Sequence, residues 1–254
     1  MLTDVKQNMQ ALGAFALLLI DVVRDIAKNG INVREVSRQM VLIGVSSIPI
    51  VLLTAVFTGM VLALQTAYGL HRFGAKNYVG NLVGLALARE LGPVLTAVMV
   101  CGRVGAGIAA EISSMVVTEQ VDAIRALGGN PIQRLVTPRI VAGTISMPLL
   151  AGIAVITGIL GGGVVAVAEL GITSHQYYRS YIYAVQIRDV TDGLIKSVGF
   201  GVLVSSIACF KGLRCRGGTE GVGLTTTSAV VTGSLMVFIA NFFFTKLLII
   251  LNFK

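Results

Sequence analysis

Three long stretches without a charged residue constrain the fold of this chain most strongly. Val41–Leu64, Ile140–Ala168 and Gly221–Thr245 hold no Asp, Glu, Lys or Arg over 24, 29 and 25 residues. Because a helix rises about 1.5 Å per residue, each is long enough to cross a hydrocarbon core about 30 Å thick. Of the 254 residues, 55% are hydrophobic and 13% charged, and soluble domains average about 25% charged residues. The sequence therefore predicts an all-α integral membrane protein.

Two further spans are expected. Leu194–Phe210 is shorter, but Lys196 can extend its ammonium group toward the membrane surface and lengthen the usable helix. The region between Asn77 and Met115 is apolar apart from four charged residues, and its length suits one long or broken span. The prediction is thus five spans. The four charged residues are Arg89, Glu90, Arg103 and Glu111.

The run Gln7–Ile20 is too short to cross a bilayer. Its apolar residues recur at helical spacing and basic and acidic residues follow, which is typical of an amphipathic helix lying at the membrane interface. A helix packed inside the protein is the alternative. The segment lacks the basic start and cleavage site of a signal peptide, so we expect it to be retained. The apolar positions are Leu12, Phe15, Leu19 and Val22 or Val23.

The distribution of Lys and Arg predicts the orientation. With the N-terminus inside, the predicted cytoplasmic segments 1–40, 103–139 and 211–220 carry 12 of these residues, and the exterior segments 65–77, 169–196 and 246–254 carry 7. The positive-inside rule then favours a cytoplasmic N-terminus and an exterior C-terminus. The net charge of +8 is scattered along the chain, which indicates contact with anionic lipid head groups and not with nucleic acid.

No motif for catalysis or metal binding is present. The chain has no GxxxxGK[ST], HExxH or GxSxG pattern. Its three cysteines, Cys101, Cys209 and Cys215, lack metal or redox spacing, and we interpret them as small apolar fillers. We therefore expect no catalytic residue, no metal site and no cofactor in this chain.

The polar segment after the second span predicts a short amphipathic helix. Thr118 is a suitable N-cap, and Glu119 and Asp122 suit the positive end of a helix. Asp122 can pair with Arg125 at i,i+3. The apolar residues Val121, Ile124 and Leu127 lie near one face, and Gly128-Gly129 ends the helix.

A second short helix is expected to follow. Asn130-Pro131 is typical of a helix start, and we expect Pro138 to end this helix. The two-part segment has two interpretations. It is either a surface helix lying on lipid or a lever that docks its narrow apolar face into a groove of a soluble partner.

Four stretches carry a family resemblance. "ARELGPVLTAVMVCGRVGAGIAAEI", "TEQVDAIRALGGNPIQRLVTPR", "LIKSVGFG" and "GGTEGVGLTTTSAVV" resemble the MlaE/YrbE permease family, the membrane subunits of ABC transporters that work with MCE-domain lipid-binding proteins. The similarity covers roughly Gly59 to Leu248, in the family's order. It implies a homodimer in which 1–254 form one permease domain. Residues 1–38 would be the N-terminal interfacial region, and residues 39–254 the transmembrane region, with a coupling helix at 117–138.

The resemblance also implies the partners and the substrate. A separate cytoplasmic ATPase would bind ATP and Mg, and MCE proteins would lie on the exterior side of the bacterial inner membrane. Lipids, usually phospholipids, would move between the inner and outer membranes. The residues implied to contact the ATPase are Glu119, Val121, Asp122, Ile124, Arg125 and Leu127. An ion-coupled secondary transporter using Glu90, Glu111 and Arg103 is the main alternative, and a membrane scaffold is a third.

Arg89 and Glu90 admit two interpretations. Charges at membrane depth normally face protein or water, and adjacent helical residues point about 100° apart, so we expect each to have another partner. They form either an ion-pair network that stabilises a helix broken at Gly92-Pro93, or a polar patch that binds a lipid head group, with Arg89 facing the phosphate. The resemblance adds further candidates for the lipid cavity, which are Leu62, Gln65, Phe73 and Leu91. It also implies that many relatives have an Asp in the last span, where this chain has Asn241.

Overall fold

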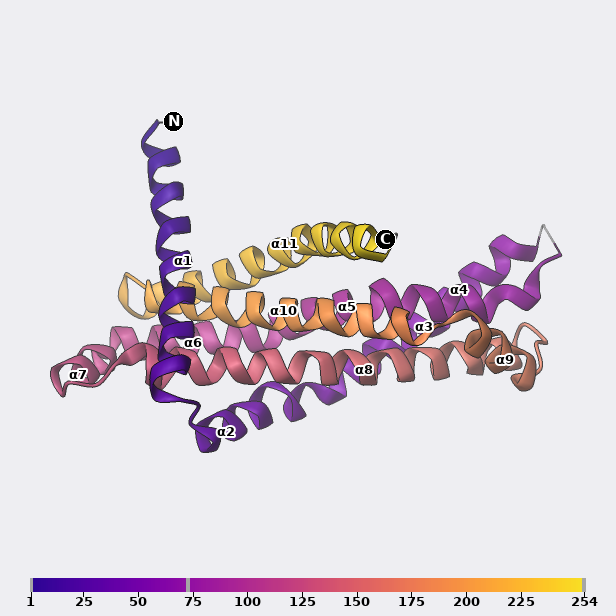
Figure 1. Ribbon diagram of the computed structural model, residues 1–254, viewed down its shortest axis with the longest axis horizontal. Coiled ribbons are helices and arrows are strands. Elements are labelled where there is room, and N and C mark those ends of the chain that lie inside the picture. The colour runs from indigo at the N-terminus through magenta and orange to yellow at the C-terminus, as the bar shows by residue number, and fades with distance from the viewer. Residues whose placement is uncertain (1, 72–73, 253–254) are drawn as a thin grey trace.

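The structure is a computed structural model that describes residues 2–71 and 74–252, without the side chains of residues 2–9, 11 and 252. The described residues form helices and no strand. Five helical runs are long and apolar enough to cross a membrane, and they lie side by side along the long axis of the molecule (Figure 1). The five-span prediction is confirmed. The runs are Val33–His71, Lys76–Val117, Ile132–Ala168, Ile187–Leu213 and Gly218–Leu251.

Most spans are built from several helical elements. The chain starts with α1 (Leu2–Asn29), and the first span joins α2 (Val33–Ile43), η1 (Val45–Ser47) and α3 (Ile48–His71). The second span joins η2 (Lys76–Tyr78), α4 (Val79–Ala86), η3 (Leu87–Leu91), α5 (Gly92–Val100), η4 (Cys101–Gly105) and α6 (Ala106–Val117). The remaining elements are α7 (Gln120–Ala126), η5 (Ile132–Val136), α8 (Thr137–Ala168), α9 (Ser174–Ala184), α10 (Ile187–Leu213) and α11 (Gly218–Asn252).

The second span contains two π-helical turns. The first, η3, lies directly before Pro93, and the N–H of Gly92 donates to the carbonyl of Leu87, five residues back. Proline cannot donate a backbone hydrogen bond and its ring crowds the preceding turn, so a wider turn lets the helix continue through it. The predicted break at Gly92-Pro93 is therefore wrong: the helix continues, and its irregularity is a π turn over Leu87–Leu91. The second π turn, η4, carries Arg103.

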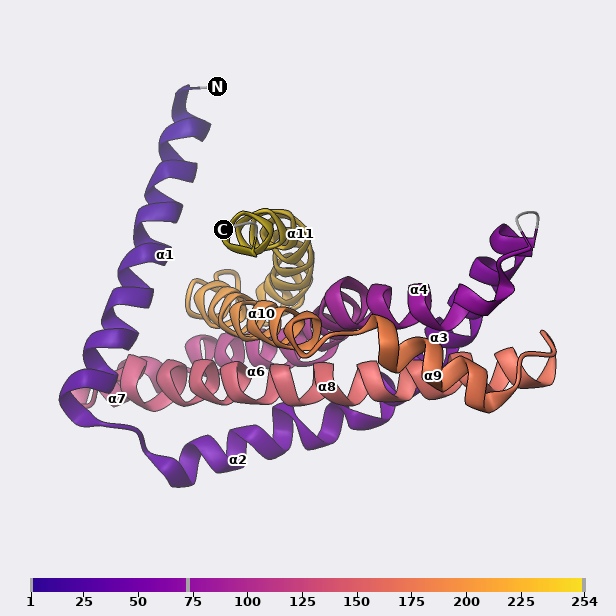
Figure 2. The same ribbon diagram turned by 45° about the vertical axis from the view of Figure 1, so that its right-hand side comes forward.

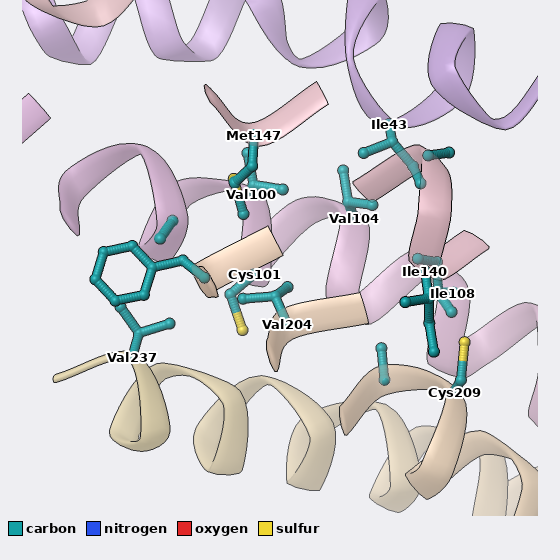
Figure 3. Packing of buried hydrophobic residues seen from close by; sticks show 14 of the residues in the cluster. Ile43, Val100, Cys101, Val104, Ile108, Ile140, Met147, Val204, Cys209 and Val237 are labelled. Atoms are coloured by element: carbon teal, nitrogen blue, oxygen red, sulfur yellow. The ribbon is translucent and has the colours of Figure 1, made fainter. Parts of the chain in front are cut away.

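The α8 helix lies at the centre of the bundle, with α3 on one side and α10 on the other (Figures 1 and 2). Glycines allow α3 and α8 to approach closely, since a Cβ at Gly59 would lie 1.8 Å from the carbonyl oxygen of Gly158. Branched aliphatic and sulfur-containing side chains fill the space between α2, the second span, α8, α10 and α11 (Figure 3). Among them are Ile43, Val100, Cys101, Val104, Ile108, Ile140, Met147, Val204, Cys209 and Val237.

We expect Gly59→Ala to lower the stability of the protein by about 1–3 kcal/mol, the usual cost of overpacking. The added methyl group meets backbone atoms of α8, which cannot move aside as a flexible side chain can. Gly69→Ala, on the same helix with nothing within 4 Å, is the matched control, and it should be neutral or slightly stabilising. Thermal unfolding of the two purified variants measures the difference. Equal stability of the two would contradict the close packing of α3 on α8.

The α1 helix lies across one end of the bundle (Figures 1 and 2). Its inner face buries Leu18, Val22 and Asp25, and Phe15 packs edge-on against Phe210 of α10 at 5.4 Å. Leu12, expected on the same apolar face, is 69% exposed because it lies beyond the bundle. The helix thus packs on the protein by its second half, with its axis across the spans, as an interfacial helix requires.

Two predictions about the segment around α7 were wrong. Thr118 does not cap α7; it ends α6, and its hydroxyl donates to the carbonyl of Ser114 at 2.8 Å. Glu119 precedes α7 instead, with a φ of 58° and no side-chain cap. Pro138 does not end a short helix, because η5 runs directly into α8; η5 is a π turn that lies just before Pro138, as η3 lies just before Pro93. Gly128-Gly129 does end α7, and Gly129 N–H donates to Ile124 O at 2.9 Å.

The α11 helix touches the bundle along one side only. Phe244 packs against Phe200 of α10 with the ring centres 5.7 Å apart, while Leu235, Phe238 and Phe242 are more than half exposed. A span with such an apolar outer face suits contact with lipid or with another membrane helix.

A polar network and cavity at membrane depth

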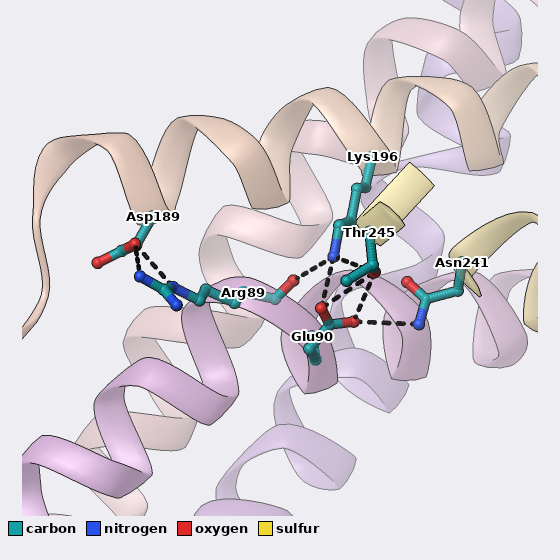
Figure 4. A network of polar contacts seen from close by, with 6 residues as sticks. All are labelled: Arg89, Glu90, Asp189, Lys196, Asn241 and Thr245. Atoms are coloured by element: carbon teal, nitrogen blue, oxygen red, sulfur yellow. Dashed lines mark hydrogen bonds and ion pairs between the residues drawn. The ribbon is translucent and has the colours of Figure 1, made fainter. Parts of the chain in front are cut away.

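Arg89 and Glu90 each pair with a residue far away in the sequence (Figure 4). Arg89 binds Asp189 of α10, with Nε and Nη2 at 2.7 and 2.6 Å from Oδ1. Glu90 binds Lys196, also on α10, at 2.7 Å. The expectation that the two neighbours do not pair with each other is confirmed. Both ion pairs join the second span to α10.

Lys196 is the most buried charge of this network, with a side chain 4% exposed. Its ammonium group donates to Glu90 Oε1, to the carbonyl of Arg89 at 3.0 Å and to Thr245 Oγ1 at 2.8 Å. The three hydrogens of an ammonium are thereby all used. Pro93 lies four residues after Arg89 and cannot donate to its carbonyl, so Lys196 supplies a donor that the helix itself lacks.

Asn241 joins α11 to the same carboxylate. Its Nδ2 donates to Glu90 Oε2 at 3.0 Å, and Thr245 donates to Glu90 at 3.1 Å. Asn241 therefore reaches Lys196 only through Glu90. An ionised Asp at this position, the residue that the resemblance suggests for many relatives, has no hydrogen to donate to Glu90. The amide of Asn241 thus suits the partner that it meets, although its Oδ1 is buried without a hydrogen bond in the described part of the chain.

The Arg89 pair is arranged differently, because its buried member is the carboxylate and its cation is exposed. Asp189 is 6% exposed and Arg89 57%. The other oxygen of Asp189 accepts the backbone N–H of Gln186 at 2.9 Å, which forms a capping box at the start of α10. Asp189 is fixed by the helix that it begins, and it holds Arg89 while much of the guanidinium stays accessible.

These residues border a cavity of about 380 Å³ between the second span, α10 and the last turns of α11. Cationic and anionic side chains line most of it, and two aliphatic side chains of α11 form an apolar edge. A cavity with both features suits a ligand that has a charged and an apolar part. The lining residues are Arg89, Glu90, Gln186, Arg188, Asp189, Asp192, Lys196, Thr245, Leu248 and Ile249.

The other predicted cavity residues do not join this site. Leu91 faces a narrow gap beside α3 and α8. Leu62 and Gln65 lie on α3, half-buried and exposed respectively, and Phe73 lies outside the described residues. The sequence analysis missed the contributions of α10 and of Thr245. The pattern of Gln186 followed three residues later by Asp189 was the available signal for the start of α10.

The six residues proposed to contact an ATPase lie on or beside α7. Asp122 and Arg125 form the predicted ion pair at 2.8 Å, and both are exposed, as is Glu119. The predicted apolar face is not continuous, however. Val121 is 3% exposed because it packs on the bundle, Ile124 is half-buried, and Leu127 is 88% exposed. Leu127, directly after α7, is the large apolar side chain of this segment that is free to meet a partner.

Among residues 2–71 and 74–252, no group of three or more His, Cys, Asp or Glu residues is placed to hold a metal ion. Cys101, Cys209 and Cys215 are buried and unpaired, which suits apolar packing.

Comparison with known proteins supports the resemblance. The Permease MlaE family matches residues 36–247. A probable ABC transporter permease protein of Rickettsia typhi is 44% identical over 239 residues, 94% of this chain and 92% of the relative. The intermembrane phospholipid transport system permease protein MlaE of Haemophilus influenzae is 40% identical over 212 residues, 83% of this chain and 81% of the relative.

A plant protein is also similar. Protein TRIGALACTOSYLDIACYLGLYCEROL 1 of Arabidopsis thaliana, which is chloroplastic, is 37% identical over 221 residues, 87% of this chain and 63% of the relative. The family match covers most of all five spans, including the six residues of the polar network, which come from the second span, α10 and α11. This chain belongs to the MlaE permease family.

Proposed function

We propose that this protein is the permease subunit of an ABC transporter that moves phospholipids between the inner and outer membranes of a bacterium. Two comparisons support this function: the chain belongs to the MlaE permease family, and the Haemophilus relative is named as a phospholipid transport permease. The structural observation that carries it is the cavity between the second span, the start of α10 and the last turns of α11. There a largely accessible Arg89 faces a polar space with Leu248 and Ile249 at its edge, the combination of charge and apolar surface that a phospholipid presents.

The proposed assembly has two copies of this chain. The exposed apolar face of α11 offers a surface for a second copy, and opening and closing of a space between the copies would move the lipid. An MCE-domain protein would receive or deliver lipid on the exterior side. The N-terminus would be cytoplasmic, which puts α7 in the cytoplasm, at the end of the bundle where α1 also lies (Figure 1).

ATP and Mg would be bound by a separate ATPase that contacts α7. No GxxxxGK[ST] motif is present in this chain. The α7 helix is tethered to a span at each end, since it follows α6 and leads through η5 into α8. A displacement of α7 would therefore act on the second and third spans together, and η3 and the ion pairs of Arg89 and Glu90 lie along the second span.

Reconstitution tests this function. The chain, its ATPase and its exterior partner are placed in liposomes with a fluorescent phospholipid, and transfer to acceptor vesicles is followed with and without ATP. ATP-dependent transfer is expected, and none is expected from the chain alone. Transfer that needs an ion gradient and no ATPase would instead favour the secondary transporter. Glu90, which that alternative would use for ion coupling, is instead bound by Lys196, Asn241 and Thr245.

Arg89→Gln should lower phospholipid transfer about tenfold or more, the effect of losing one charge-assisted hydrogen bond. Stability should change by about 1 kcal/mol or less, because the ion pair is partly exposed and the Gln amide can still donate to Asp189.

Gln65→Ala is the matched control for Arg89→Gln, since Gln65 lies on α3 outside this cavity. It should transfer lipid normally. Loss of transfer in Gln65→Ala with normal transfer in Arg89→Gln would place the lipid path along α3, where the family resemblance had suggested it.

A further inference from the structure

Within the described ranges, Arg103 of the second span lacks the carboxylate partner that three other basic residues of the spans have. Arg89, Lys196 and Arg139 each have a carboxylate partner, at 2.6, 2.7 and 2.8 Å. Arg103 has none among the described residues; Nη1 donates to the carbonyl of Ser46 and to Ser47 Oγ, 3.2 Å away. A charge at membrane depth is costly unless a counter-charge or water reaches it. Arg103 therefore lacks a counter-charge in the described part of the chain.

The free side of Arg103 opens into a groove. A cavity of about 220 Å³ lies between α2 and the second span, and Arg103 lies on its wall with Gln39 and Glu111. In the described part of the chain, Nε and Nη2 of Arg103 have no hydrogen-bond partner, and the residue is exposed. Both nitrogens are donors in the forked geometry that binds phosphate or carboxylate.

Gln39 gives an independent indication of a ligand. The residue is only 9% exposed, and it lies on the wall of the groove. Its amide makes no hydrogen bond to any residue that the structure describes, so this group has capacity for an oxygen acceptor that enters the groove. Glu111, the acidic residue of the groove, is already paired with Arg139.

The rest of the groove is apolar and open. Leu42, Ile43, Val104 and Ile108 line it, and a Cβ at Gly107 would meet nothing within 4 Å. The "CGRVGAGIAAE" stretch thus packs within the chain on one face only: a Cβ at Gly105 would contact Val204 at 3.7 Å, while the face that carries Gly107 is uncovered. An acyl chain can lie against such a surface.

The depth of Arg103 fits a lipid phosphate. The 42-residue span is about 63 Å long and exceeds a bilayer of about 40–45 Å by roughly 20 Å. If the excess is shared between both ends, Arg103 lies roughly 10 Å below the membrane surface on the α7 side, because it is about 21 Å along the helix from Val117. Arginine can extend toward head groups over such a distance.

We propose that the groove between α2 and the second span binds a phospholipid of the leaflet on the α7 side, with its phosphate on Arg103 and Gln39. The site is separate from the cavity at Arg89, and it would hold a lipid before or after transport. The inference rests on the proposed function for the identity of the ligand. A carboxylate from a second copy of the chain is the competing source of the anion.

Photolabelling of the assembled transporter in nanodiscs tests the proposal. A phosphatidylethanolamine with a diazirine on its acyl chain should label the peptides containing Leu42–Ile43 and Ile108. Arg103→Gln should reduce this labelling about tenfold or more, and Arg103→Lys, which keeps the charge, should reduce it less. Labelling near Leu248 should not change in either variant. A diacylglycerol with the same diazirine chain but no phosphate should label the groove weakly.

Equal labelling by the two probes, or full labelling of Arg103→Gln, would overturn the proposal. The competing anion is tested with Gly107→Cys: complete disulfide linkage between two copies in native membranes would show that a second copy covers the groove, and would also overturn it. These outcomes are independent of ATP-driven transfer. If the unsubstituted protein transfers lipid normally but its groove is not labelled, this site alone is contradicted. If the groove is labelled but no transfer occurs, the proposed function is contradicted.

Discussion

Lys196→Met should be among the most destabilising single substitutions in this protein, by about 3–5 kcal/mol. The side chain is 4% exposed and neutralises Glu90 while it also satisfies Thr245 and the carbonyl of Arg89. Methionine fills similar space but donates no hydrogen bond and carries no charge, so the carbonyl of Arg89 would lose the lysine donor and Glu90 its counter-charge. The loss should be near the lower end of the range, because Glu90 is 37% exposed and water can partly replace the ammonium. Thermal unfolding in detergent, together with the yield of folded protein, measures it.

A double substitution separates loss of the ion pair from loss of packing. Lys196→Met combined with Glu90→Gln removes both charges, and replacing a whole buried pair is often close to neutral. The double variant should recover at least half of the stability that Lys196→Met loses, and Glu90→Gln alone, which leaves Lys196 without its counter-charge, should be destabilised as well. Additive effects of the two substitutions would mean that the pair contributes no coupling energy.

The helices were predictable because the membrane imposes a simple rule on the sequence. Val41–Leu64, Ile140–Ala168 and Gly221–Thr245 lack charge because charged side chains are costly in hydrocarbon, and all three lie inside observed spans. Even the imperfect second span was expected from its length. What the pattern could not show was the form of its irregularity, since a π turn and a kink are both compatible with a proline in a helix.

The polar network was only half predictable, for a different reason. That Arg89 and Glu90 need separate partners follows from helix geometry, but Asp189 and Lys196 are 100 and 106 residues away. Such pairings depend on which faces of the spans meet, and the sequence of one chain carries no direct record of that. Asp189 also has a sufficient local explanation as a capping residue, which concealed its contact with Arg89.

Local signals were ambiguous at helix boundaries. Thr118 resembles an N-cap because three polar residues precede the apolar positions of α7, yet its hydroxyl bonds back to Ser114 and ends α6. Pro138 resembles a helix end, but proline is equally acceptable in a first helical turn. The apolar residues after Pro138 distinguish the two cases, because Ile140–Ala168 is a span whose helix extends back past Pro138 into η5.

Leu127→Asp should separate this protein from its ATPase. Leu127 is 88% exposed at the end of α7, and a large apolar side chain on a tethered polar segment is the natural anchor for a groove. Burying an unpaired carboxylate in such an interface should cost several kcal/mol and lower the affinity by at least about a hundredfold. Ile124→Asp is less informative, because Ile124 packs against Gly129 and its replacement would also disturb the turn.

Co-purification of the ATPase with each variant is the direct measurement, and Leu127→Met, which keeps the apolar volume, is the matched control. The Met variant should retain the ATPase, while both variants should fold normally, since nothing packs on this side chain within the chain. The burial of Val121 makes the test sharper: it already fixes α7 to the bundle, so loss of the ATPase in Leu127→Asp cannot come from release of the helix. Undiminished co-purification with undiminished lipid-coupled ATP hydrolysis would move the coupling surface elsewhere, and the basic loop 211–221 is then the segment to substitute next.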